Sequence, residues 1–236
     1  MSHIHRGRYT SYIHRSVLLA VFAALAYAAM FAFRFNVSFL TFDVKDAVVT
    51  IGGLILGPIA ALITSLLVAV LELITVSDTG WYGFVMNFAS TATFSVVCSL
   101  VYVYRKKLLG AIAGLVAALV SMVTVMMTLN LLVTPLYMGV PRTDVAALIP
   151  TLLFPFNLVK GMVNASLVLI LYKPVSRVVR ATRWLPRPMH ATTPVDPAAK
   201  RKRLWISLAV TVVGLLLLVG AVCAFFLLLG GQISAG

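Results

Sequence analysis

The sequence has few charged residues for its length, and acidic residues are the scarcest of them. Of its 236 residues 11% are charged, with 6 Asp and Glu against 19 Lys and Arg, whereas about a quarter of the residues in a soluble domain are charged. Hydrophobic residues account for 61% of the chain, and the mean hydropathy is +1.05. These values exclude an ordinary soluble domain and indicate a membrane protein with several spans.

Sequence motifs of several chemical classes are also missing. The chain contains no G-x-x-x-x-G-K-[ST] phosphate loop, so we expect it not to couple transport to ATP by itself. It contains neither H-E-x-x-H nor G-x-S-x-G, and we therefore expect no enzyme, no catalytic residues, no metal site and no cofactor. Its only cysteines, Cys98 and Cys223, lie in apolar runs, which predicts small buried side chains rather than a disulfide.

Long apolar runs dominate the rest of the sequence. A helix of about 20 apolar residues crosses the roughly 30 Å hydrocarbon core of a bilayer. The alternating pattern of transmembrane strands is absent. The runs lie at about residues 16–35, 45–76, 81–104, 108–133, 146–173 and 204–229.

Basic residues are concentrated between these runs, as the positive-inside rule describes for cytoplasmic segments. If the run 45–76 crossed the membrane once, the clusters at 105–107 and 173–187 would fall outside. If it crosses twice, turning at Gly57-Pro58, every basic cluster lies in the cytoplasm. We therefore predict seven crossings with a short helix at about 45–57, a cytoplasmic N-terminus and an outward C-terminus.

The predicted fold class is an all-α membrane protein, a six-helix bundle with one additional C-terminal transmembrane helix. Residues 182–200 are rich in Pro and Arg and indicate a linker. The predicted organisation is a cytoplasmic N-terminal segment (1–15), a six-helix membrane domain (16–180), a basic cytoplasmic linker (181–203), and an additional helix with a short outer tail (204–236).

Three polar residues share one face of the sixth predicted crossing, whose regular part we expect to start near Pro155. Asn157, Lys160 and Asn164 fall within about 60° of one another on a helix. Ionisable groups in a span are costly and usually face the bundle interior, so Lys160 is a candidate for function. The alternative is that Lys160 pairs with Asp144 or extends to the interface, with the asparagines joining helices.

Other polar residues lie near the same predicted outer end. Asn130 and Asn87 either face the same cavity or make hydrogen bonds between helices. Glu72 lies either at the membrane interface or in the functional site. The segment 39–46 suits a loop folded over a cavity, and the alternative is a solvated connection with an Asp43–Lys45 contact.

Three stretches together resemble the riboflavin-binding S component of energy-coupling factor (ECF) transporters. They are Phe39–Asp46 running into Ile51-Gly52-Gly53 and Gly57-Pro58; Glu72–Gly80 running into Met86-Asn87-Phe88; and Thr134–Pro141 followed by Pro155–Gly161. The resemblance implies a six-helix vitamin-binding protein in the cell membrane, with its site near the outer face. It also implies a transmembrane coupling protein and two cytosolic ATPases as partners.

The resemblance further implies roles for particular residues. Riboflavin has a pyrimidine edge, which carboxamides and an ammonium can hydrogen-bond, an apolar ring end and a ribityl tail. At the pyrimidine edge the implied contacts are Asn130, Asn157 and Lys160, with Asn164 as a weaker member. Thr41 and Asp43 are implied at the ribityl tail. The implied apolar walls are Leu40, Phe42, Met86 and Phe88, and Asn87 is implied as a further contact beside these walls.

Small residues recur every fourth position on the first apolar run, at Ala20, Ala24, Ala28 and Ala32. In the family such a stripe contacts the coupling protein, and the alternative is close packing inside the chain's own bundle. Two other functions stay open: an S component for a different vitamin, and a structural membrane protein without a ligand.

Overall fold

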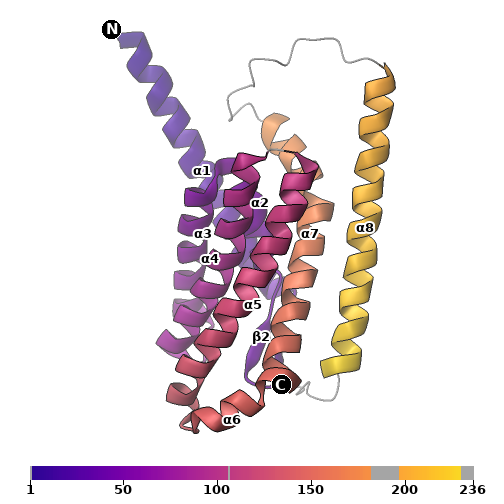
Figure 1. Cartoon of the computed structure of the whole chain (residues 1–236). Helices are drawn as coiled ribbons and strands as arrows, with labels where there is room; N and C mark the ends of the chain where they lie inside the picture. Colours follow the sequence, from indigo (N-terminus) through magenta and orange to yellow (C-terminus); the bar gives the residue numbers. More distant parts are fainter. Residues whose placement is uncertain (1, 106, 182–196, 230–236) are drawn as a thin grey trace.

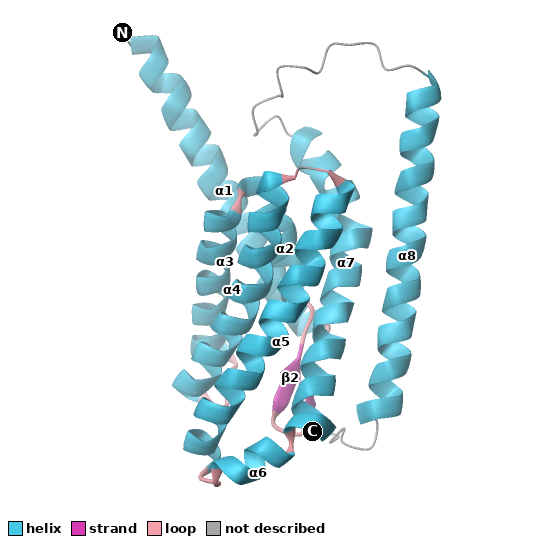
Figure 2. Ribbon diagram, in the orientation of Figure 1, coloured by secondary structure: helices cyan, strands magenta, loops and turns pink. Residues whose placement is uncertain are grey.

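The computed structural model describes residues 2–105, 107–181 and 197–229 and is almost entirely helical (Figure 1, Figure 2). Its elements are α1 (Ser2–Ala32), β1 (Phe35–Val37), β2 (Leu40–Phe42), α2 (Lys45–Leu56), α3 (Pro58–Thr75), α4 (Gly80–Tyr104), α5 (Leu108–Met138), α6 (Arg142–Ala147), the π-helix η1 (Ile149–Leu153), α7 (Phe154–Ala181) and α8 (Pro197–Leu229). The expectation of an all-α membrane fold is confirmed.

The longer helices run alternately between two ends of the bundle (Figure 1). We call the end with the α4–α5 connection and the last turns of α7 the basic end, and the end with β1, β2 and α6 the hairpin end. Five helical segments are long and apolar enough to span a membrane, namely Ile13–Ala32, Pro58–Thr75, Gly80–Tyr104, Leu108–Met138 and Ile149–Val179. In α8 the apolar stretch Leu208–Ala224 is shorter. Seven crossings and their orientation therefore stay predictions.

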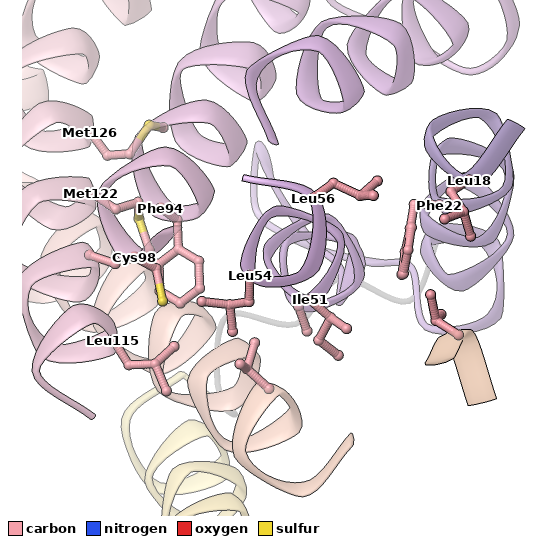
Figure 3. Packing of buried hydrophobic residues seen from close by; sticks show 14 residues of the cluster. Leu18, Phe22, Ile51, Leu54, Leu56, Phe94, Cys98, Leu115, Met122 and Met126 are labelled. Atoms are coloured by element: carbon pink, nitrogen blue, oxygen red, sulfur yellow. The ribbon is translucent and has the colours of Figure 1, made fainter. Parts of the chain in front are cut away.

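The short helix predicted at about 45–57 is confirmed as α2, and its shortness follows from its ends. Gly57 leaves the helix with φ 106°, which favours glycine, and Pro58 occupies the first turn of α3. Ten of the 12 residues of α2 are buried. In Figure 3, Ile51 and Leu54 point from this central helix toward surrounding ones that carry Phe94 on one side and Phe22 on the other. A short helix is tolerated because protein, not lipid, surrounds its polar ends.

Close packing of α2 depends on Gly53. A Cβ there would lie 2.7 Å from the Cβ of Ala61 and would overlap the hydroxyl of Ser99. We expect Gly53→Ala to destabilise the protein by about 1–3 kcal/mol, because overpacking displaces backbone as well as side chains. Thermal unfolding in detergent measures the change. The matched control is Gly220→Ala on α8, where a Cβ meets nothing within 4 Å; equal melting temperatures for the two variants would contradict the prediction.

The outer helices α1 and α8 differ from expectation in detail. The predicted boundary at residue 16 falls inside the continuous helix α1, and most of the predicted linker 181–203 and the tail after 229 lie outside the described residues. The helix predicted from 204 begins at Pro197 and packs along α7. Cys98 is buried as expected, but the interpretation of Cys223 as buried is wrong, because it lies on an exposed face of α8.

The alanine stripe faces away from the bundle. Ala20, Ala24, Ala28 and Ala32 are all exposed, whereas α1 packs on α2 and α3 through the opposite face with Phe22 and other buried residues. The alternative that the stripe packs inside this chain's own bundle is therefore wrong.

Candidate functional site

A β-hairpin formed by β1 and β2 lies among the helices at the hairpin end (Figure 1). β1 and β2 pair antiparallel, with Asn36 opposite Thr41, and a two-residue turn joins them in which Ser38 has φ 54°. The Thr41 hydroxyl donates to Asn36 Oδ1 at 3.1 Å. Alternate residues such as Val37 are fully buried. Successive side chains of a strand point to opposite faces, so the hairpin carries polar side chains on one face while apolar side chains on the other hold it to the bundle.

Below the hairpin lies a cavity of about 300 Å³. Elements far apart in sequence line it: the hairpin, the start of α4, α5 and the start of α7. The lining residues are Arg34, Asn36, Ser38, Phe39, Leu40, Thr41, Ser77, Asp78, Thr79, Tyr82, Gly83, Met86, Asn87, Ser90, Met126, Asn130, Tyr137, Phe156, Asn157 and Lys160. Polar and aromatic groups of this kind, in a partly enclosed hollow, are typical of a small-molecule site.

Lys160 lies in the wall of this cavity and is only 4% exposed. Its Nζ donates to Asp43 Oδ2 at 2.9 Å and lies 3.5 Å from the carbonyl oxygen of Thr41. The alternative of a Lys160–Asp144 pair is wrong, since Asp144 is exposed and accepts a hydrogen bond from Thr143. Lys160 therefore joins α7 to the hairpin while facing the cavity.

Asp43 and Lys160 belong to a buried network of charges. Lys45 Nζ lies 3.1 Å from Asp43 Oδ2 and 2.8 Å from Glu72 Oε1, and Asn87 Nδ2 donates to Glu72 Oε2 at 2.8 Å. Burial alone would raise the pKa of Asp43, but the ammonium groups of Lys160 and Lys45 outweigh it and hold that pKa below its ordinary value. The predicted Asp43–Lys45 contact is present, but the alternative of a solvated connection is wrong because both residues are buried, and Glu72 is buried rather than interfacial.

Two carboxamides in the cavity wall keep hydrogen-bonding capacity. Asn130 Nδ2 donates to the carbonyl oxygen of Met126, and Asn157 Nδ2 donates to that of Leu153, each at 2.8 Å and four residues back. Each amide nitrogen carries a second hydrogen. Asn130 Oδ1 also accepts a hydrogen bond from Thr134 at 3.0 Å. Both amides are thus held by their own helices with a donor left for a ligand.

The structure divides the predicted site residues into two groups. Those that line the cavity are Leu40, Thr41, Met86, Asn87, Asn130, Asn157 and Lys160; those that do not are Phe42, Asp43, Phe88 and Asn164. Asp43 is occupied by the two lysines. Asn164 accepts from the backbone N–H of Ala47 at 2.8 Å and donates to the carbonyl oxygen of Asp43 at 3.2 Å, which ties α7 to the start of α2.

The two phenylalanines of the second group contact other rings. Phe42 stacks on Phe35 with centroids 4.8 Å apart and meets the cavity residue Phe156 edge-on at 6.2 Å. Phe88 stacks on Phe84 at 6.2 Å. Phe42 thus supports the cavity wall from behind through Phe156.

Sequence reasoning missed the aromatic residues of the cavity mouth. The ring of Tyr137 lies 6.1 Å from that of Tyr82 and 6.4 Å from that of Phe39, centroid to centroid, and all three line the cavity. Tyr82 was not among the predicted site residues. Its spacing of four residues from Met86 was the available signal, because residues four apart share a helix face.

Comparisons with known proteins agree with this geometry. The family model for the substrate-specific component of ECF transporters matches residues 14–172. The chain is 27% identical over 177 residues to the riboflavin transporter RibU of Staphylococcus aureus (strain TCH60), covering 70% of this chain and 92% of RibU. A solved structure, described as the S component of a bacterial ECF transporter, superimposes with a TM-score of 0.60 at 25% identity, covering 70% of this chain and 97% of that one. The resemblance found in the sequence is confirmed, and the chain belongs to the family of substrate-specific components of ECF transporters.

Proposed function

We propose that the protein binds riboflavin in the cavity below the hairpin and delivers it inward as the substrate-binding subunit of an ECF-type importer. The hairpin end faces outward and the basic end faces the cytoplasm, as the distribution of Lys and Arg predicts. The transported vitamin is a substrate, and the chain itself supplies no catalytic group.

The observation that carries this proposal is the convergence of Lys160, Asn157 and Asn130 on one cavity beneath aromatic rings. An ammonium and two amides supply donors and acceptors for the carbonyl and N–H groups of a pyrimidine edge. Tyr82, Tyr137 and Phe39 supply flat apolar surfaces for a fused heterocycle. Asn36 and Thr41 on the hairpin offer polar partners to the ribityl hydroxyls.

The partners of this proposal are a transmembrane coupling protein and two cytosolic ATPases. The exposed alanines at 20, 24, 28 and 32 form a smooth surface on α1 to which another helix can approach closely. Because α8 packs along α7 whereas α1 packs on α2 and α3, the additional helix leaves this stripe uncovered (Figure 1). The stripe is the surface we assign to the coupling protein.

Replacing Asn157 with leucine tests the binding site with little change in shape. We expect the affinity for riboflavin to fall about 10- to 100-fold, because a ligand group loses its hydrogen-bond partner in an enclosed cavity. Quenching of flavin fluorescence in a titration with the purified protein measures this loss. The thermal stability of the free protein is expected to change little, since among the described residues Asn157 donates only to the carbonyl oxygen of Leu153, one turn back in the chain.

The contrasting variant is Asn164→Leu, which changes a carboxamide on the same face of α7, two turns further along the helix and outside the cavity lining. It removes hydrogen bonds between α7 and the start of α2, so lowered thermal stability is the expected result. Equal losses of affinity and of stability in both variants would show that the asparagines only hold helices together. Tighter binding of an unrelated vitamin than of riboflavin would contradict the assigned substrate.

A further inference from the structure

A groove at the basic end lies between α5, α7 and α8, on the side of the molecule away from α1. It consists of two adjoining hollows of about 120 and 230 Å³ that share Leu115 of α5 and Leu169 of α7. α8 completes it through Val210 in the first hollow and Leu217 in the second. We call it the α8 groove.

The walls of the α8 groove are apolar along most of its length. The second hollow is lined only by aliphatic and methionine side chains, among them Leu119, Met162 and Leu217. α8 is held beside α7 by a close approach at Gly214, where a Cβ would lie 2.9 Å from Ile170. A groove of this shape and lining, within the membrane-spanning part of a protein, fits an acyl chain.

The first hollow of the groove is lined by basic as well as apolar side chains. Lys107, immediately before α5, and Lys173, near the end of α7, both line it together with Tyr172. Neither lysine has an ion-pair partner among the described residues. The acidic residues of the described ranges, Asp43, Asp46, Glu72, Asp78 and Asp144, all belong to the hairpin end. Within residues 2–105, 107–181 and 197–229, cations therefore gather at this end without acidic counter-charges.

We propose that the α8 groove binds an anionic phospholipid from the leaflet at the basic end. The phosphate lies between Lys107 and Lys173, and one acyl chain follows Leu115, Leu169 and Leu217 toward the middle of the membrane. Basic pockets between transmembrane helices bind anionic headgroups in this way. The additional helix thus has a role that does not involve the vitamin cavity: it forms the third wall of a lipid site.

Native mass spectrometry of the full chain in detergent tests the proposal with dioleoylphosphatidylglycerol and dioleoylphosphatidylcholine as probes. We expect one phosphatidylglycerol to remain bound under conditions that remove phosphatidylcholine. Because each basic residue near an anionic lipid contributes about 1 kcal/mol, Lys107→Gln/Lys173→Gln is expected to weaken phosphatidylglycerol binding roughly 30-fold. The matched control, Arg142→Gln at the hairpin end, is expected to leave it unchanged.

Two further measurements separate the parts of the site. Leu217→Trp fills the apolar part and is expected to weaken lipid binding while both lysines are retained. Glycerol 3-phosphate, which has the charge but no acyl chain, is expected not to compete. Equal retention of the two phospholipids, unchanged binding in the double glutamine variant, or full competition by glycerol 3-phosphate would each overturn the proposal. Retained riboflavin binding in every variant shows that the chain is folded.

Discussion

Exchange of Lys45 for methionine is expected to lower the free energy of unfolding by about 3–5 kcal/mol, because it leaves buried carboxylates without their cation. The Lys45 side chain is 2% exposed and bridges Asp43 and Glu72 at 3.1 and 2.8 Å. After the exchange Asp43 keeps Lys160, but among the described residues Glu72 keeps only its hydrogen bond from Asn87. Thermal unfolding in detergent measures the loss.

The control for Lys45 is a cation at the same end that is exposed. Arg142→Met is expected to change the stability by less than about 1 kcal/mol, because exposed charges contribute little. Adding Glu72→Gln to Lys45→Met is expected to recover part of the lost stability, since it removes the unpaired carboxylate. A melting temperature for Lys45→Met equal to that of Arg142→Met would show that the network contributes nothing to folding.

Exchange of Lys160 for methionine is expected to lower riboflavin affinity about 100-fold, because a charge-assisted hydrogen bond in an enclosed site is lost. The same exchange removes one of the two cations that neutralise Asp43, so the free protein is expected to become less stable as well. Lys160→Met alone therefore cannot separate binding from folding. Flavin titration and thermal unfolding are both needed.

A double variant separates the two effects of Lys160. In Asp43→Asn/Lys160→Met the carboxylate and its partner are removed together, while the Lys45–Glu72 pair remains. We expect stability to recover toward that of the parent protein and riboflavin affinity to stay low. Recovery of both would mean that Lys160 only neutralises Asp43, and the proposed ligand contact would be wrong.

Patterns among residues close together in the sequence were sufficient to predict a helix boundary and a polar helix face. The glycine and proline at 57 and 58 predicted where one apolar run divides, and the structure ends α2 at Leu56 and begins α3 at Pro58. The spacing of Asn157, Lys160 and Asn164 predicted one polar helix face, and all three are buried on α7. Helical periodicity contains this information because it depends only on residues within a few turns of each other.

The contacts between side chains on different helices could not be predicted from these sequence patterns. The face that carries Asn157 and Asn164 is divided in the structure, because Asn157 lines the cavity while Asn164 bonds to the start of α2, 117 residues away. Asp43 was placed at the ligand by resemblance, but it does not line the cavity and lies between two lysines. Sequence spacing contains no record of which helices become neighbours.

The sequence by itself determined that this protein is a bundle of membrane helices, because burial in lipid demands apolar runs, and the basic residues concentrated between those runs predicted which end is cytoplasmic. Only the tertiary structure decided which polar groups face the cavity and which neutralise one another. Both choices depend on distances of about 3 Å between helices far apart in the chain, and packing sets those distances.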